Sequence, residues 1–259
     1  MIDLDKAKRY FYKYTDRYDA NVPRVRLKIT HIEQVAANSR KISQLIGLSE
    51  ECQNLAELIG WLHDIGRFEQ VKVYNTFSDR QSVNHAQKSV EVLFQDHEIR
   101  NFIIPNQYDH IIECAISNHN KLQIDTGLSE QEKLFCQIIR DADKLDIFRA
   151  NLTERLEDLV HLETDDVSAE ILSPEFYQTF HNQRPLKFAD CKTNMDFLVC
   201  ILAFIYDFNF RESLGIIAEQ DYISKIIERI NAKDPSTHKQ MAELGVYANE
   251  YIENKIKSP

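Results

Sequence analysis

The sequence predicts an all-α fold for the whole chain. Its 259 residues include only 6 glycines and 6 prolines, too few for the frequent tight turns of an all-β protein. Apolar residues recur every three or four positions along long stretches, which is the period of helices that bury one face. The composition, 43% hydrophobic and 28% charged, is typical of a globular protein with a sizeable core. We therefore expect one helical domain over residues 1–259.

Helices are expected wherever this period continues between residues that break helices. Pro23 follows the first helix, which has an aromatic side, and Gly47 ends the second. Gly66 follows the third helix, in the position where glycine favours a C-terminal cap. Residues 67–82 show no sustained period and are predicted to form a connecting loop. The predicted helices cover residues 1–20, 26–46, 50–65, 84–96, 107–119, 129–160 with a break near Arg149 to Leu152, 194–209, 213–231 and 235–256.

The net charge, the cysteines and the length of the apolar segments indicate where the protein works and which classes of partner it excludes. A formal net charge of -10 argues against nonspecific nucleic-acid binding, because that affinity comes from Lys and Arg contacts to phosphates. The five cysteines have no CxxC spacing and are expected to be reduced thiols. No apolar segment approaches the length of about 18 residues that a membrane span requires. The sequence thus predicts a cytoplasmic protein without a membrane or a long nucleic acid as partner.

One carboxylate, that of Asp143, falls on an apolar stripe. It lies in line with Phe135 and Ile139 at helical spacing. A carboxylate in such a position costs several kcal/mol unless it is paired, hydrogen-bonded or metal-bound. One candidate partner is a neighbouring base, Arg140 or Lys144.

The other candidate partner of Asp143 is a divalent cation shared with residues on other helices. His31 lies on the apolar side of the second predicted helix, and His63 and Asp64 form a doublet at the end of the third. Imidazole and carboxylate together suit Mn, Fe, Co, Ni or Zn, whereas sites made of oxygen alone suit Mg or Ca. The sequence therefore predicts a divalent transition metal, with Mg as the alternative.

The ordered series of a single His, a His-Asp doublet and a distal Asp resembles the HD-domain superfamily of metal-dependent phosphohydrolases. The segments that carry the resemblance are "ITHIEQVAANSRKISQLIGL", "ELIGWLHDIGRF" and "IRDADKLDIF". The resemblance implies an HD core over about residues 26–150, with residues from about 151–259 as a helical extension. It also implies the ligands of one metal ion: His31, His63, Asp64 and Asp143.

Two more histidines match positions that hold a second ion in some members of the superfamily. These are His85 in "VNHAQKSVEVL" and His119 in "AISNHNK", with Asp64 as the bridging ligand. The chain departs from the branch that cleaves cyclic dinucleotides, because Asn118 stands where that branch has the first residue of a His-His pair. One ion is therefore expected, and two ions are the alternative.

Phosphate ester hydrolysis needs a positioned water and cations that neutralise the phosphoryl oxygens. Asp64 is predicted to orient that water as well as to bind metal, with Arg67 and Lys144 as the other catalytic residues. Arg26, Arg67 and Lys144 are predicted to bind the substrate phosphate, because they are basic and adjoin the motifs. Further bases near the motifs, which fit a solvated surface equally well, are Arg24, Lys88 and Lys121.

The predicted function is metal-dependent hydrolysis of a nucleotide or another small phosphorylated metabolite. A cyclic nucleotide or cyclic dinucleotide phosphodiesterase with two ions is one alternative. Another is a regulatory module that binds metal or nucleotide without turnover, and a third is a structural role in which Asp143 only pairs with a base. The aromatic side of the first helix is a candidate homodimer interface.

Overall fold

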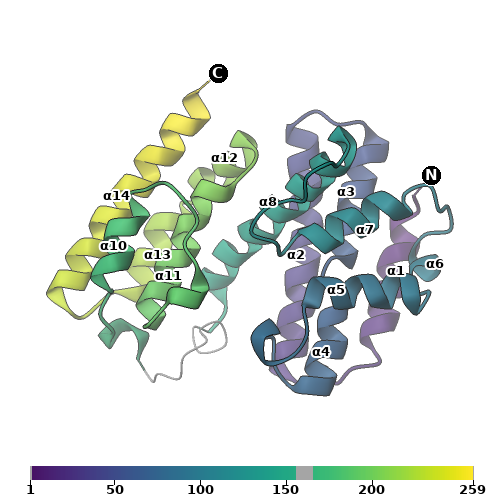
Figure 1. Cartoon of the computed structure of the whole chain (residues 1–259), viewed down its shortest axis with the longest axis horizontal. Coiled ribbons are helices and arrows are strands. Elements are labelled where there is room, and N and C mark those ends of the chain that lie inside the picture. Colours follow the sequence, from purple (N-terminus) through teal and green to yellow (C-terminus); the bar gives the residue numbers. More distant parts are fainter. Residues whose placement is uncertain (1, 156–165, 259) are drawn as a thin grey trace. The chain divides into compact units, whose positions relative to one another are not determined.

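Helices make up the regular structure of this protein. The computed structural model describes residues 2–155 and 166–258, which are traced in Figure 1. Within these residues there are α-helices and short 3-10 and π-helical turns, and there is no strand. The predicted all-α fold is confirmed. The chain divides into two compact units, Met1–Asp143 and Lys144–Pro259, each described by itself below. The single domain expected from the sequence stays a prediction.

The first unit contains α1 to α7 and the first part of α8. Within it, α2 and α3 pack side by side, as do α4 and α5 (Figure 1). Pro23 is the first residue of α2, where the missing N–H of proline costs nothing, so α2 begins three residues earlier than predicted. The helices are α1 (Leu4–Thr15), α2 (Pro23–Leu45), α3 (Glu50–Leu62), α4 (Gly66–Tyr74), α5 (His85–Val90), α6 (Ile99–Phe102), α7 (Asp109–Asn118) and α8 (Glu130–Thr153), with a 3-10 turn at Asp79–Gln81 and a π-helical turn at Glu91–Gln95.

The predicted loop over 67–82 is wrong in its first half, which forms α4. The helical period is hidden because a polar residue, Gln70, lies fully buried on the inner side of this helix. Its side-chain amide donates hydrogen bonds to Asp79 Oδ1 and to the carbonyl oxygen of Val83, at 3.0 Å each. Gly66 therefore begins α4 and does not cap α3.

The aromatic side of α1 packs inside the first unit. Phe11 and Tyr14 are buried, and the ring of Phe11 lies 5.0 Å from that of Trp61 between centroids. The ring of Tyr14 lies 6.2 Å from that of Phe68. Because these side chains are covered by their own unit, they are not available as the homodimer interface suggested by the sequence.

The helix α8 runs across the boundary between the two units. The break predicted near Arg149 to Leu152 falls next to the end of α8 at Thr153, and Glu154 is not helical. Residues 156–160 of the predicted helix lie outside the described residues.

Over the described residues 144–155 and 166–258, the second unit contains the end of α8 and five further α-helices, of which α12 and α13 pack against α14 (Figure 1). The predicted helix 213–231 is in fact two helices, because Asp221 has a left-handed φ of 51° that interrupts the α-helix. The predicted helix 194–209 changes after Leu202 into a 3-10 turn, Ala203–Asp207. The five helices are α10 (Pro174–Phe180), α11 (Asn194–Leu202), α12 (Arg211–Glu219), α13 (Tyr222–Ile230) and α14 (Pro235–Lys257).

Candidate metal centre

The carboxylate of Asp64 lies among four histidines of the first unit. Asp64 Oδ2 is 3.6 Å from His31 Nε2 and 3.7 Å from His63 Nε2. Asp64 Oδ1 is 3.6 Å from the Nε2 atoms of both His85 and His119. The two oxygens of one carboxylate thus face two different pairs of imidazoles.

Four separate segments bring these side chains together. His31 lies on α2, and His85 is the first residue of α5. His63 and Asp64 follow the last residue of α3, and His119 follows the last residue of α7. All five are buried, so the packing of the helices holds the cluster.

The spacing of the ligand atoms fits divalent ions. Two groups have their nitrogen and oxygen atoms within 4.8 Å of one another: His31, His63 and Asp64 in one, and Asp64, His85 and His119 in the other. An ion about 2.1 Å from each ligand places neighbouring ligand atoms about 3.0 to 3.4 Å apart in octahedral or tetrahedral geometry. The distances of 3.6 to 3.7 Å to Asp64 need only a small contraction.

Asp143 joins the first of these groups through His31. Its Oδ1 atom lies 3.2 Å from His31 Nε2, and burial alone would raise the pKa of this carboxyl. The hydrogen bond and charge of His31 outweigh that effect and hold the pKa of Asp143 below its usual value. The side chain is 21% exposed, so this carboxylate is less buried than its place on an apolar stripe predicts. The first ligand group is therefore partly exposed to solvent at Asp143.

The imidazoles of His63 and His119 are held by backbone carbonyls. His63 Nδ1 lies 2.8 Å from the carbonyl oxygen of Gly60, and His119 Nδ1 lies 2.7 Å from that of Ile116. A carbonyl oxygen only accepts hydrogen bonds, so Nδ1 is the protonated nitrogen in both rings. The lone pair of each Nε2 therefore points toward Asp64, as in histidines that bind metals.

His85 is oriented in the same way by a residue that the sequence did not single out. Asp79 Oδ2 lies 2.6 Å from His85 Nδ1, and this arrangement of carboxylate, imidazole and ligand site is common around metals. The Nε2 atoms of His85 and His119 are then 3.0 Å apart with both lone pairs facing inward. Two such lone pairs repel each other unless a cation lies between them.

Two buried atoms of the cluster point to the same conclusion. Among the described residues, neither His63 Nε2 nor Asp64 Oδ1 has a hydrogen-bond partner. A buried polar atom without a partner costs about 1 to 3 kcal/mol. An ion on each side of Asp64 satisfies both atoms, so the residues fit divalent cations.

The protonation states suit metal binding at neutral pH. Burial lowers the pKa of His63 to about 3 and that of His85 to about 4, so both imidazoles are neutral ligands. Burial alone would raise the pKa of Asp64, but Lys28, His63 and Arg67 together hold it well below its usual value. The cluster therefore offers neutral nitrogens around an ionised carboxylate.

The chelator-treated protein is expected to lose stability as the pH falls from about 6.5 to 4. The unfolded chain protonates His63 and His85 near their ordinary pKa of 6.5, whereas the folded chain keeps them neutral to about 3 and 4. Each group then costs up to about 1.4 kcal/mol per pH unit across this window. Thermal unfolding of the stripped protein at several pH values measures the slope, with H110Q as a control at an exposed histidine. A stability that is flat across this window would contradict the neutral, buried imidazoles.

Two glycines flank the His-Asp doublet where helices approach closely. A Cβ atom on Gly60 would lie 2.5 Å from the Cα atom of Ala36 on α2. A Cβ atom on Gly66 would lie 2.4 Å from the backbone nitrogen of Ser89 on α5. Both positions require glycine for space, which lets α2 and α5 bring their histidines up to Asp64.

The predicted substrate-binding bases lie in different surroundings. Arg67 reaches the cluster, with Nε 3.6 Å from Asp64 Oδ1. Arg26 is exposed on α2, and Lys144 pairs at 2.9 Å with Asp207, both of them in the second unit. Their roles stay predictions. The further bases contact other groups: Arg24 with Asn75, Lys88 with Glu91 and Lys121 with Asp125.

Lys28 is a cation of the cluster that the sequence did not single out. Its Nζ atom lies 2.6 Å from Asp64 Oδ2. The signal was its spacing, because Lys28 precedes His31 by three residues and so shares its side of α2. Arg26 lies five residues before His31, about 140° away around the helix.

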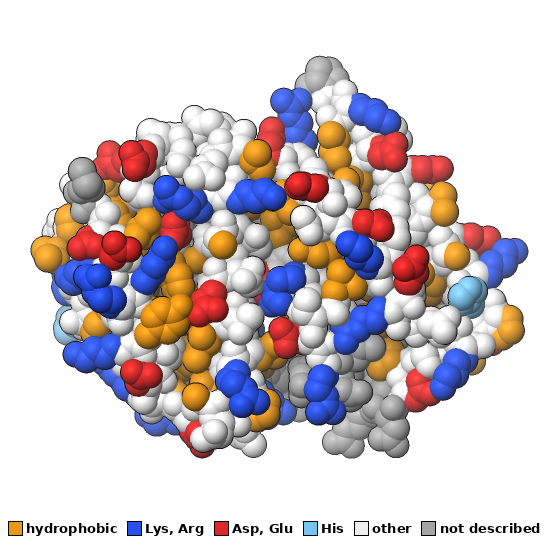
Figure 2. All heavy atoms as spheres, turned by 180° about the vertical axis from the view of Figure 1, so that it is seen from behind, with side chains coloured by type: hydrophobic (Ala, Val, Ile, Leu, Met, Phe, Trp, Pro, Cys, Tyr) orange, Lys and Arg blue, Asp and Glu red, His pale blue; other side chains and the backbone are white. Residues whose placement is uncertain are grey.

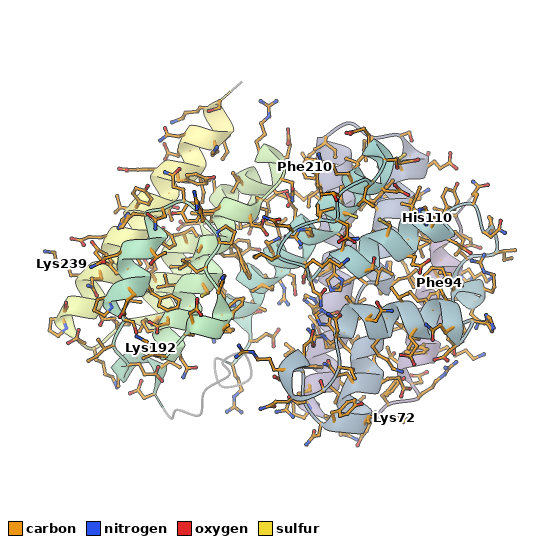
Figure 3. All side chains as sticks on the ribbon, in the orientation of Figure 1. Lys72, Phe94, His110, Lys192, Phe210 and Lys239 are labelled. Atoms are coloured by element: carbon orange, nitrogen blue, oxygen red, sulfur yellow. The ribbon has the colours of Figure 1, made fainter. Side chains whose placement is uncertain are left out.

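Not every histidine near the cluster in sequence belongs to it. His110 lies at the start of α7, is 81% exposed and contacts Glu132 Oε1 at 2.7 Å (Figure 3). His119 at the other end of the same helix is buried in the cluster. His110 is exposed because it lies in the first turn of α7, whereas His119 is buried because it follows the last residue of α7, next to the cluster.

Residues 29–147 match the family described as the HD domain. The matched segment contains all six predicted ligand residues, His31, His63, Asp64, His85, His119 and Asp143. No curated protein and no solved structure matches the chain.

Proposed function

Because residues 29–147 form an HD domain, which confirms the resemblance seen in the sequence, we propose that this protein is a metal-dependent phosphohydrolase. Its substrate is proposed to be a nucleotide or another small phosphorylated metabolite. The observation that carries the proposal is the carboxylate of Asp64, each oxygen of which faces its own pair of imidazoles. A carboxylate placed in this way suits a pair of bridged cations better than it suits a structural ion pair.

The proposed ligands form two sets that share one residue. His31, His63, Asp64 and Asp143 would hold the first ion. Asp64, His85 and His119 would hold the second, with Asp79 fixing the ring of His85. Nitrogen and carboxylate donors favour Mn, Fe, Co, Ni or Zn over Mg.

A bound divalent ion would polarise the phosphoryl group and lower the pKa of water, which supplies a nucleophile at neutral pH. The chain's own residues would position the reactants. Asp64 is ionised and central, so its oxygens can orient the attacking water. Arg67 is the predicted base nearest to this carboxylate, which supports its part in neutralising phosphoryl oxygens. Arg26 as a phosphate-binding residue, and Lys144 as a phosphate-binding and catalytic residue, remain proposals.

A phosphodiesterase acting on cyclic nucleotides or cyclic dinucleotides is the second candidate. It is favoured by the 3.0 Å approach of the His85 and His119 Nε2 atoms, which supports a second ion. Asn118, which replaces a histidine of the dinucleotide-cleaving branch, is a structural residue here. Its side chain donates to the carbonyl of Cys114 at 2.9 Å and accepts from the amide of Asp125 at 2.9 Å.

An assay against a substrate panel tests the proposal. Purified protein is incubated with nucleoside mono-, di- and triphosphates, aryl phosphates and cyclic nucleotides, each with Mn, Co, Ni or Mg. We expect metal-dependent release of phosphate or pyrophosphate, or ring opening of a cyclic substrate in the second case. Thermal stabilisation by these compounds without any product would instead support a regulatory module.

The variant H119A is expected to bind one metal ion fewer per chain than the wild type. It removes one ligand of the second set and leaves the first set intact. Elemental analysis of protein purified with Mn measures the content. H110A, on the same helix but exposed, is the matched control and should keep the wild-type content. An unchanged metal content in H119A would contradict the second set.

The proposed partner is a small substrate, not a polymer. Lys and Arg side chains are interspersed with Asp and Glu on the face drawn in Figure 2, instead of forming one basic stripe. None of the described helices combines the length and the apolar character that crossing a bilayer requires. All five cysteines are free, which agrees with the proposed cytoplasmic location.

A further inference from the structure

Among the described residues, Lys28 makes the shortest side-chain contact to the central carboxylate, that of Asp64. Its Nζ atom donates a 2.6 Å hydrogen bond to Asp64 Oδ2, the oxygen that also faces His31 and His63. The side chain is 14% exposed, compared with 3% for that of Asp64 and none for that of His63, so Lys28 lies nearer the outside of the cluster than these two ligands. This side of the cluster is where we expect a ligand to reach the first ion.

The ammonium of Lys28 has donors to spare. In the described part of the chain it has one hydrogen-bond acceptor, Asp64 Oδ2, and its other near neighbour is the ring of Phe77, 5.4 Å from Nζ to the centroid. An ammonium carries three N–H donors. A ring face attracts a cation without accepting a conventional hydrogen bond, so donors remain for a ligand.

Arg67, the other base near Asp64, has one nitrogen that is committed to the protein. Its Nη1 atom contacts Gln70 Oε1, the carbonyl of Phe77 and Asp79 Oδ1, at 2.8, 2.6 and 3.1 Å. These contacts hold the segment after α4 against the cluster. Arg67 Nε, in contrast, is a buried donor without a hydrogen-bond partner among the described residues. Lys28 differs from Arg67 in its direct 2.6 Å contact to Asp64 Oδ2, the oxygen of the first ligand set, whereas Arg67 lies 3.6 Å from Oδ1.

We propose that Lys28 binds a phosphoryl oxygen of the substrate and that Asp64 holds its ammonium in place for this contact. A phosphate monoester or free phosphate bound to an ion held by His31, His63 and Asp64 would have oxygens near Nζ, because Nζ contacts the same carboxylate oxygen that these two imidazoles face. Lys28 then neutralises charge that the ion alone does not reach. The inference rests on the proposed metal-dependent function and adds a residue to it.

Calorimetry on the full chain tests the inference without turnover. Mn is titrated first, and inorganic phosphate is then titrated into the Mn-loaded protein, for the wild type, K28M and K28R. K41M, at an exposed lysine of the same helix, is the control. Circular dichroism and Tm establish that each variant is folded.

We expect K28M to bind phosphate about 10- to 100-fold more weakly, which is the range for loss of a charge-assisted hydrogen bond. Its affinity for Mn should stay the same or increase, because the ammonium no longer competes for Asp64 Oδ2. K28R should retain most of the phosphate affinity, and K41M all of it.

A phosphate affinity in K28M within twofold of the wild type would overturn the inference. So would a parallel loss of Mn affinity, because Lys28 would then only support the carboxylate. A wild-type protein that binds Mn and phosphate through Lys28 but turns over no substrate would contradict the proposed function alone. A wild type that binds no Mn would contradict both.

Discussion

The substitution D64N is expected to abolish metal-dependent phosphate release, by about 1,000-fold or more. The amide has nearly the shape of the carboxylate but no charge, and it cannot bridge two cations. Both ligand sets therefore lose a residue at once. A bound ion stabilises phosphoryl transfer by several kcal/mol, and each 1.4 kcal/mol is a factor of ten in rate.

Initial rates on the best substrate of the panel, together with metal content per chain, measure this effect. D96N, an exposed substitution of the same kind, is the matched control and should keep both. Wild-type rates in D64N would remove Asp64 from the mechanism. A D64N protein that keeps its metal but loses activity would restrict Asp64 to orienting water.

The substitution G66A is expected to destabilise the first unit by about 1 to 3 kcal/mol and to reduce metal binding at the second set. Its new Cβ atom would lie 2.4 Å from Ser89 N and 2.6 Å from Lys88 C, and backbone atoms cannot rotate away. The start of α5 must shift, and His85 is the first residue of that helix. The shift moves His85 away from Asp64.

Scanning calorimetry and Mn content test this prediction. G215A on α12 is the control, because nothing lies within 4 Å of its added Cβ atom. Alanine there should stabilise the helix by up to about 1 kcal/mol. Unchanged stability and metal content in G66A would contradict the role assigned to close packing beside the doublet.

Much of the fold follows from the helical period of the sequence. The amphipathic helices α2, α7 and α14 lie close to their predicted positions, since each buries one apolar side. The six predicted ligand residues lie in one cluster: four histidines surround Asp64, and Asp143 contacts one of them, His31. Each of them is a His or Asp on or next to a predicted helix, which made the group recognisable as an ordered series.

The features that were missed depend on tertiary contacts. Helix α4 is hidden because Gln70 faces inward and finds its partners in the following segment. Asp79 lies in that segment, and no local pattern connects it to His85. Lys28 was not singled out, although its spacing from His31 was a signal, because its contact with Asp64 is made between separate segments. Nearness to a motif in the sequence favoured Arg26 instead, although helical geometry turns Arg26 away from His31.

The most direct test of the central claim is a crystal of the protein grown with Mn and measured at a wavelength where Mn scatters anomalously. We predict an anomalous peak between Asp64, His31 and His63, and a second peak between Asp64, His85 and His119. A single peak at the first position would limit the centre to one ion. The absence of any peak at Asp64, in a crystal where Mn binds elsewhere, would contradict the proposed metal centre.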